Sequence, residues 1–237
     1  MRVITDEQLI AQRAKLGKRA SLIGLLILLV GFVVSFSPQL FLVSLGCLIV
    51  GFTVSNIGVY NANQWVREPR ADQVLTRAMK GFSNKFTLFN YTGPVPHVVV
   101  GPSGVIVFLV KSQDGRIIVN GGRWKHPFTL RRLFGFFGTE SLGNPSRDLK
   151  TLIEATQKFV AKVLPEVEVP VHGAVVFSSP KAELTIQNPD VPVLTEKQVK
   201  EFLRSVSKAE VLSPEQRKAL MEAFQGRYRG PEAQDES

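Results

Sequence analysis

Two apolar runs near the start of the chain contain no Asp, Glu, Lys or Arg across residues 21–60. The first run covers residues 22–34 and the second covers residues 40–60, and Pro38 lies where the chain reverses between them. About 20 apolar residues span a bilayer core as a helix, because amide groups in lipid must find their hydrogen bonds within the segment. The pattern therefore predicts a transmembrane helical hairpin over residues 21–60.

Basic residues flank the hairpin on both sides, whereas its turn carries no charge. Cytoplasmic flanks carry an excess of Lys and Arg, so we expect a multi-pass protein of the cell membrane with two helices and both termini in the cytoplasm. Membrane lipids are then its first partner. Tyr60 and Trp65 are expected at the headgroup level, as an aromatic belt. The flanking cations are Arg13, Lys15, Lys18 and Arg19 before the first run and Arg67, Arg70, Arg77 and Lys80 after the second.

Two other interpretations of the apolar runs remain. A signal peptide also has a basic start and an apolar centre, and residues 35–37 resemble a small-x-small cleavage site. The segment before the first run is long, however, and the second run would stay as an anchor after cleavage. A helix pair in a soluble core would carry polar residues on its outward faces, and these runs carry almost none.

The remainder of the chain predicts one α/β domain with a mixed central sheet over residues 61–206. The unbroken apolar run 105–111 is typical of a strand buried on both faces. Residues 1–20 are expected as a basic cytoplasmic segment, 207–225 as a C-terminal helix and 226–237 as a disordered tail. Within the domain we expect helices over residues 68–81, 144–164 and 195–206, and strands over residues 86–91, 97–100, 105–111, 116–119, 123–125, 169–177 and 191–194.

Composition restricts the chemistry further. The formal net charge is +9, from 29 Lys and Arg against 20 Asp and Glu, which suits an anionic leaflet or nucleic acid, although the hairpin flanks explain part of the surplus. The single cysteine, Cys47, lies inside the second apolar run, so one chain can form neither a disulfide framework nor a cysteine zinc site. The three histidines lack metal-ligand spacing, and we expect no structural metal.

A family resemblance comes from residues 96–111, PHVVVGPSGVIVFLVK, followed by Gly115. This segment resembles the nuclease-related domain (NERD) family, and Asn144-Pro145, the helix after it and the strand ending at Phe177 are similar to that family's second half. The resemblance covers roughly residues 72–204. It implies a restriction-endonuclease-like fold, in which an acidic residue begins one strand and a Glu-x-Lys motif lies on the next.

The family chemistry needs two carboxylates that hold Mg²⁺ and a lysine on the same side of the strand, two residues from the glutamate. Counting from Gly104, the family's aspartate position falls on Pro96 and its glutamate position on Leu109, while Lys111 stands at the expected place. Neither proline nor leucine coordinates a metal ion through its side chain. We therefore expect a catalytically degenerate site with no metal and no cofactor, and a lysine whose ammonium either reaches water or keeps a phosphate contact.

The function predicted from the sequence is that of a membrane-anchored nuclease-related domain that acts in binding or assembly, with DNA or RNA as the candidate partner. One alternative is a metal-dependent nuclease with a non-standard site that uses Asp72, Lys111 and Gln113 together with Mg²⁺. Another is a purely structural membrane protein. A protein partner and a homo-oligomer both stay open, because nothing in the sequence identifies them.

Two basic segments are candidates for contact with nucleic acid or lipid. Arg123 and Lys125 flank a tryptophan, as on a nucleic-acid surface, although a tryptophan on a hairpin is more often half-buried. Arg131 and Arg132 precede three phenylalanines within the loop 131–138. That loop is expected either to enter the headgroup region of the bilayer or to pack against the sheet.

Overall fold

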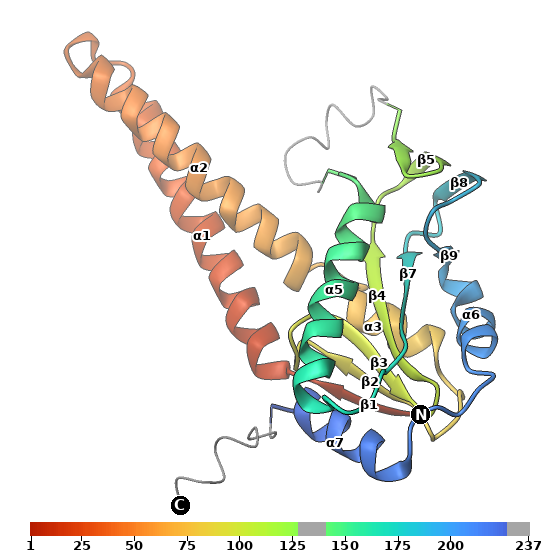
Figure 1. The fold of residues 1–237 in the computed structure, drawn as a ribbon. Coiled ribbons are helices and arrows are strands. Elements are labelled where there is room, and N and C mark those ends of the chain that lie inside the picture. The colour runs from red at the N-terminus through yellow and green to blue at the C-terminus, as the bar shows by residue number, and fades with distance from the viewer. Residues whose placement is uncertain (128–140, 227–237) are drawn as a thin grey trace, which may run out of the picture. The chain divides into compact units, whose positions relative to one another are not determined.

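The computed structural model describes residues 1–127 and 141–226, which belong to two compact units (Figure 1). We call residues 7–70 the helical hairpin. The α/β domain is formed by residues 1–6, 71–127 and the chain from residue 142 onward. Arg131, Arg132 and the rest of the phenylalanine-rich loop lie outside the described residues, as does the tail from residue 227.

The helical hairpin consists of α1 (Glu7–Val34), a 3₁₀ turn η1 (Pro38–Leu40) and α2 (Phe41–Trp65). Both long helices meet the length and composition needed to cross a membrane, and only 17% and 11% of their apolar windows are buried. Core helices of a soluble protein would be mostly buried. Helix α1 begins at Glu7, well before the apolar run, because residues 8–20 are rich in good helix formers and contain no proline.

Small residues spaced seven apart form the contact between the two helices. Because their side chains are short, the backbones approach closely, and the Ser44 hydroxyl donates a hydrogen bond of 2.9 Å to the Gly31 carbonyl across the contact. Trp65 continues this row and is only 9% exposed, whereas Tyr60 is 54% exposed. The placement of Tyr60 and Trp65 at the headgroup level stays a prediction. The buried rows are Ile10, Gly17, Gly24 and Gly31 on α1 and Ser44, Gly51, Gly58 and Trp65 on α2.

A six-stranded mixed sheet is the centre of the α/β domain, with the strand order β1-β2-β3-β4-β7-β9. Strands β2, β3 and β4 form an antiparallel meander, while β1 runs parallel to β2, and β7 runs parallel to both β4 and β9. The prediction of a mixed α/β domain is thereby confirmed. The strands are β1 (Arg2–Thr5), β2 (Thr87–Asn90), β3 (His97–Gly101), β4 (Gly104–Lys111), β7 (Val171–Phe177) and β9 (Val193–Thr195).

Helices cover both faces of this sheet. On one face α5 (Pro145–Val163) and α7 (Pro214–Phe224) pack against the side chains that include Val105 and Val107. On the other face α3 (Ala71–Ala78) and α6 (Val199–Val206) pack against those that include Ile106 and Phe108. Alternation along β4 thus divides its apolar run between two cores, as predicted for a strand buried on both faces.

A second, three-stranded sheet has the order β6-β5-β8. It contains β5 (Gly115–Asn120), β6 (Arg123–Lys125) and β8 (Ala182–Gln187). Its inner side chains, among them Ile117, Val119 and Trp124, pack into the same core as α5. The predicted strands 116–119 and 123–125 correspond to β5 and β6, which pair antiparallel around Asn120-Gly121-Gly122.

Strand β1 was not predicted from the sequence, because residues 1–20 were expected to form a basic cytoplasmic segment. Instead, β1 pairs with β2 along its whole length, and the Asp6 amide donates to the Asn90 carbonyl at 3.0 Å. A four-residue strand is too short to show a recognisable alternation of apolar and polar residues. In chain order, the helical hairpin is therefore inserted between β1 and α3 of one folded domain.

Candidate functional site

The antiparallel pair β3–β4 defines the place where the resemblance expects the two carboxylates. Val98 lies opposite Val107, and continuing this register by two residues brings Pro96 opposite Leu109. The β3–β4 pairs end at Val98 and Val107, whereas β3 stays bonded to the β2 side as far as residue 96, where the Tyr91 amide donates to the Pro96 carbonyl at 2.8 Å. Residues opposite each other on neighbouring strands have Cβ atoms about 5 Å apart. By extension of the register, the two positions face each other two residues beyond the last pair, and they are occupied by a proline and a leucine.

Lys111 lies on the same side of β4 as Leu109, two residues further along. Its side chain is only 6% exposed, and its Nζ donates to Oδ2 of Asp148 at 3.3 Å. Asp148 belongs to the first turn of α5 and is 46% exposed. The ammonium of Lys111 is therefore paired with a carboxylate and does not lie in open water. Asp148 is the residue of this site that the sequence interpretation missed.

The other two predicted residues lie outside β4. Asp72 is buried in the first turn of α3, on the helix that packs against the opposite face of the sheet, and its charge acts on His97. Gln113 is also buried and follows the end of β4. The structure thus places Lys111 beside α5 and Asp72 on the face covered by α3.

A buried polar chain runs from β1 through β2 to β3. The Asn90 amide donates to the Thr5 hydroxyl at 3.1 Å, which turns its carbonyl oxygen toward His97. That oxygen lies 2.9 Å from Nδ1 of His97, so Nδ1 carries the proton and donates. Burial lowers the pKa of His97 to about 4, and the nearby charge of Asp72 opposes this shift. His97 is therefore a neutral histidine at neutral pH.

The residues at this place do not fit a magnesium ion. Mg²⁺ is held in proteins by carboxylate and other oxygen ligands, usually from one or two carboxylates plus waters. Neither Pro96 nor Leu109 has such an oxygen in its side chain, and Asp148 is paired with a lysine. Among residues 1–127 and 141–226, no group of three His, Cys, Asp or Glu side chains is placed to hold a metal ion.

The outer face of the three-stranded sheet brings cations together. Arg123 and Lys125 are exposed on β6 and lie opposite Asn120 and Ile118 of β5. By strand alternation, Arg116 of β5 shares this face and is also exposed. We call Arg116, Arg123 and Lys125 the basic face. Arg116 was not singled out from the sequence, although its spacing of two from Ile118 on a predicted strand would have found it.

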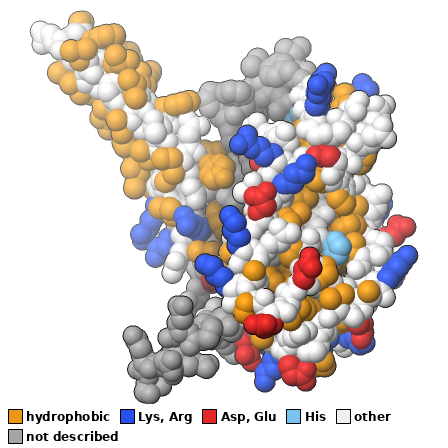
Figure 2. Space-filling model, viewed as in Figure 1, with side chains coloured by type: hydrophobic (Ala, Val, Ile, Leu, Met, Phe, Trp, Pro, Cys, Tyr) orange, Lys and Arg blue, Asp and Glu red, His pale blue; other side chains and the backbone are white. Residues whose placement is uncertain are grey.

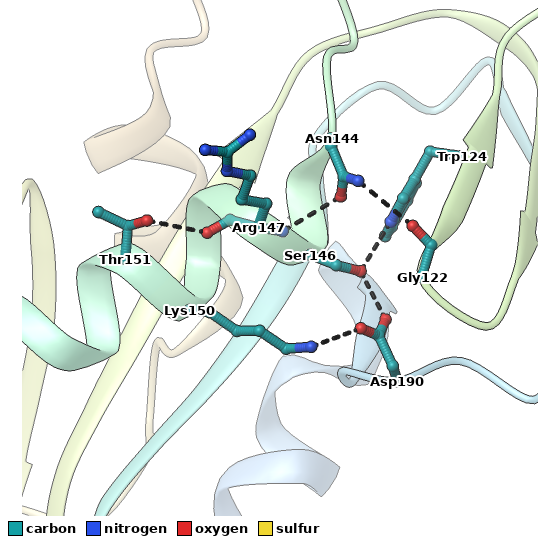
Figure 3. A network of polar contacts seen from close by, with 8 residues as sticks. All are labelled: Gly122, Trp124, Asn144, Ser146, Arg147, Lys150, Thr151 and Asp190. Atoms are coloured by element: carbon teal, nitrogen blue, oxygen red, sulfur yellow. Dashed lines mark hydrogen bonds and ion pairs between the residues drawn. The ribbon is translucent and has the colours of Figure 1, made fainter.

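Trp124 points the other way and is not available for stacking. Its indole Nε1 donates to the Ser146 hydroxyl at 2.7 Å, and its ring lies 6.2 Å from that of Phe177. Ser146 in turn donates to Asp190 at 2.6 Å, and Lys150 binds the second carboxylate oxygen at 2.7 Å (Figure 3). The hydrogen bond from Lys150, followed by that from Ser146, holds the pKa of Asp190 below its usual range. This network fastens β6 to the start of α5.

Replacing Ser146 by alanine is expected to lower the free energy of unfolding by about 1–3 kcal/mol, because the half-buried indole N–H loses its acceptor. The measurement is urea denaturation of the purified full-length protein in detergent. Thr151→Ala is the matched control, since this exposed hydroxyl bonds only the Arg147 carbonyl of its own helix. Its effect should stay within about 0.5 kcal/mol. Equal losses for the two variants would contradict a bridging role for Ser146.

Comparison with known proteins identifies the family. A family model described as nuclease-related domain matches residues 60–178, about half of the chain. The matched segment contains β3, β4 and α5, and therefore the place where Lys111 meets Asp148. Searches of the curated proteins and of the solved structures each found no match. The match agrees with the resemblance drawn from residues 96–111, and the chain belongs to the nuclease-related domain family.

Proposed function

We propose that this protein is a membrane-anchored nuclease-related domain that binds nucleic acid and does not hydrolyse it. The observation that carries the proposal is that, two residues beyond the last β3–β4 pair of Val98 with Val107, Pro96 and Leu109 occupy the two positions where the family is expected to place carboxylates. Without them, no metal ion is available to stabilise charge on a phosphodiester or to activate water. Lys111, which remains, is neutralised by Asp148.

The proposed fold is restriction-endonuclease-like. Its support is the order of α3, the meander β2-β3-β4, helix α5 and then β7 parallel to β4. This order agrees with the expectation from the resemblance, in which the catalytic positions fall on two adjacent strands.

Membrane anchoring by the helical hairpin is supported by the large apolar side chains that it exposes over residues 22–60 (Figure 2). Because the hairpin is inserted between β1 and α3 of one folded domain, both of its ends have to emerge on the same side of a bilayer. The cations on both flanks favour the cytoplasmic side. We therefore propose a cell-membrane protein with the α/β domain in the cytoplasm.

Nucleic-acid binding is proposed for the basic face. Three exposed cations on neighbouring strands can contact successive phosphates, whereas the inward Trp124 offers no ring for base stacking. Binding should then depend on the charge of the nucleic-acid backbone and little on the base sequence. Each lost phosphate contact should reduce the salt dependence of the affinity.

The test uses the full-length protein in nanodiscs of zwitterionic lipid with labelled duplex DNA or RNA, in the presence of Mg²⁺ or Mn²⁺. We expect salt-sensitive binding without cleavage. Replacing Arg116, Arg123 and Lys125 by glutamine should weaken binding and reduce the slope of log affinity against log salt by about 3. The same substitution at the exposed cations Lys158, Lys162 and Lys208 is the matched control and should leave the slope unchanged. Absence of binding at any salt would favour a purely structural protein.

A metal-dependent nuclease with a non-standard site is the second candidate. One observation favours it: α5 brings the carboxylate of Asp148 to the lysine of the former motif. This candidate requires cleavage in the same assay that disappears in both Lys111→Ala and Asp148→Asn. Cleavage that survives both substitutions would come from a contaminant or from another site.

A further inference from the structure

Helix α1 continues beyond the apolar part of the hairpin as a helix that carries four exposed cations. We call Arg13, Lys15, Lys18 and Arg19 the basic collar. At 3.6 residues per turn, Lys15 and Arg19 project from the side of α1 opposite the Gly17 row that contacts α2, and Lys18 lies about 100° around the helix from that row. Lys and Arg side chains gather at the end of the hairpin away from its turn (Figure 2).

The packing of the two helices determines how far the basic collar lies from the hydrocarbon core of the bilayer. Gly58 of α2 lies against Ser21, and Gly17 lies against Asn61, so the apolar runs, which begin at Leu22 on α1 and end at Tyr60 on α2, stop at nearly the same level. With a rise of 1.5 Å per residue, the four cations lie about 3–12 Å beyond Ser21 along the axis of α1. The headgroup layer of a bilayer is about 5–8 Å thick on each side. The collar therefore begins inside that layer and extends a few ångströms beyond its outer edge.

The only acidic residues of the hairpin are Glu7 and Glu68, at its two ends. No Asp or Glu occurs between Glu7 and Glu68. In the part of the chain that the structure describes, none of the ion pairs involves a collar residue. Four positive charges on a rigid helix, held at the level of the phosphates and left without protein counter-charges, complement an anionic surface. Such a charge is attracted to anionic lipid within about one Debye length of the membrane.

We infer that the basic collar is a binding surface for the headgroups of anionic phospholipids. This inference rests on the proposed membrane anchoring and adds a lipid specificity to it. The long, flexible cationic side chains reach the lipid phosphates, while the glycine rows keep the supporting helix fixed against α2.

The experiment measures which lipid occupies the first shell around the protein. The full-length protein is reconstituted in phosphatidylcholine vesicles with trace spin-labelled phosphatidylcholine or spin-labelled phosphatidylglycerol, and the motionally restricted fraction of each label is compared. We expect a preference of about fivefold or more for phosphatidylglycerol, the size that a cation at the membrane surface supplies. Substituting the four collar residues by glutamine should bring this ratio close to one, and added salt should reduce it in the unmodified protein.

Two matched variants control for charge and for membrane topology. Exchanging Arg and Lys at the four collar positions keeps the charge and should keep the preference. Replacing four exposed cations of the α/β domain by glutamine lowers the net charge as much as the collar variant does, and this variant should also keep the preference for phosphatidylglycerol. These residues are Lys158, Lys162, Arg204 and Lys208.

Three results would overturn the inference. The unmodified protein could show no preference between the two lipids, or the domain variant could lose the preference as completely as the collar variant. Alternatively, RNA binding could depend on the collar while lipid preference does not, which would assign the cations to nucleic acid. Failure of anchoring is distinguishable, because the protein would then leave the vesicles in an alkaline carbonate wash.

Discussion

Replacing Gly24 by leucine is expected to destabilise the helical hairpin by about 1–3 kcal/mol or more. A Cβ atom at this position would lie 2.5 Å from the backbone nitrogen of Ser55 and 2.8 Å from its Cα. Backbone atoms cannot rotate out of the way, so the two helices would have to separate along the glycine row. That separation would also remove the hydrogen bond between Ser44 and Gly31.

Gly46→Leu is the matched control, because no atom lies within 4 Å of a Cβ built at this position. Leucine is about 1 kcal/mol better than glycine in a helix, so the control should be neutral or slightly stabilising. The measurement is thermal unfolding of the full-length protein in detergent, followed by helical circular dichroism. We expect the midpoint to fall by about 5–10 °C for Gly24→Leu only. Equal midpoints for both variants would contradict the close helix contact.

The comparison of these two glycines also shows how far the sequence predicts the hairpin. The absence of charge across residues 21–60 is enough to predict two apolar helices, because burial in lipid requires it. It does not say which face of each helix meets the other, since glycines occur on more than one face. Gly24 lies in the contact and Gly46 does not, and only the packed structure separates them.

In the domain, strands buried on both faces were predicted, whereas the edge strands β1 and β8 were missed. The runs 105–111 and 169–177 match β4 and β7, because double burial requires continuous apolar residues. Strand β8, with a mixed pattern of exposure, and the short β1 lie at sheet edges and carry no such signal. Capping was more informative: Asn144 accepts a hydrogen bond from the Arg147 amide at 3.1 Å, at the predicted start of α5.

In the candidate site, too, some features could be predicted from the sequence and others depend on tertiary packing. The positions of Pro96 and Leu109 could be counted from the sequence, because a tight turn at residues 101–104 sets the register of the two strands that it joins. The meeting of Lys111 with Asp148 could not, because it depends on how α5 packs across the sheet. Spacing along the chain therefore predicts pairs within a β-hairpin and leaves contacts between a helix and a strand to the tertiary structure.

The second large effect that we expect is a steep fall in the free energy of unfolding as the pH is lowered, and it comes from His97. In the folded domain burial lowers the pKa of His97 to about 4, against 6.5 for a free histidine. Between these values the unfolded chain binds a proton that the folded domain does not, so stability is complete above about pH 6.5 and declines as the pH falls toward 4. A difference of this size corresponds to about 3 kcal/mol over the whole window.

The measurement is the free energy of unfolding of the full-length protein in detergent at several pH values between about 4 and 7. Carboxylates also titrate near the acid end of this range, so the informative quantity is the difference in slope between the unmodified protein and His97→Gln. Glutamine can still donate to Asn90 but binds no proton, and the slope attributable to His97 should disappear. His172→Gln, at an exposed histidine of β7, should leave the slope as it is. If His97→Gln titrates like the unmodified protein, the acid sensitivity does not come from the buried polar chain of β1, β2 and β3.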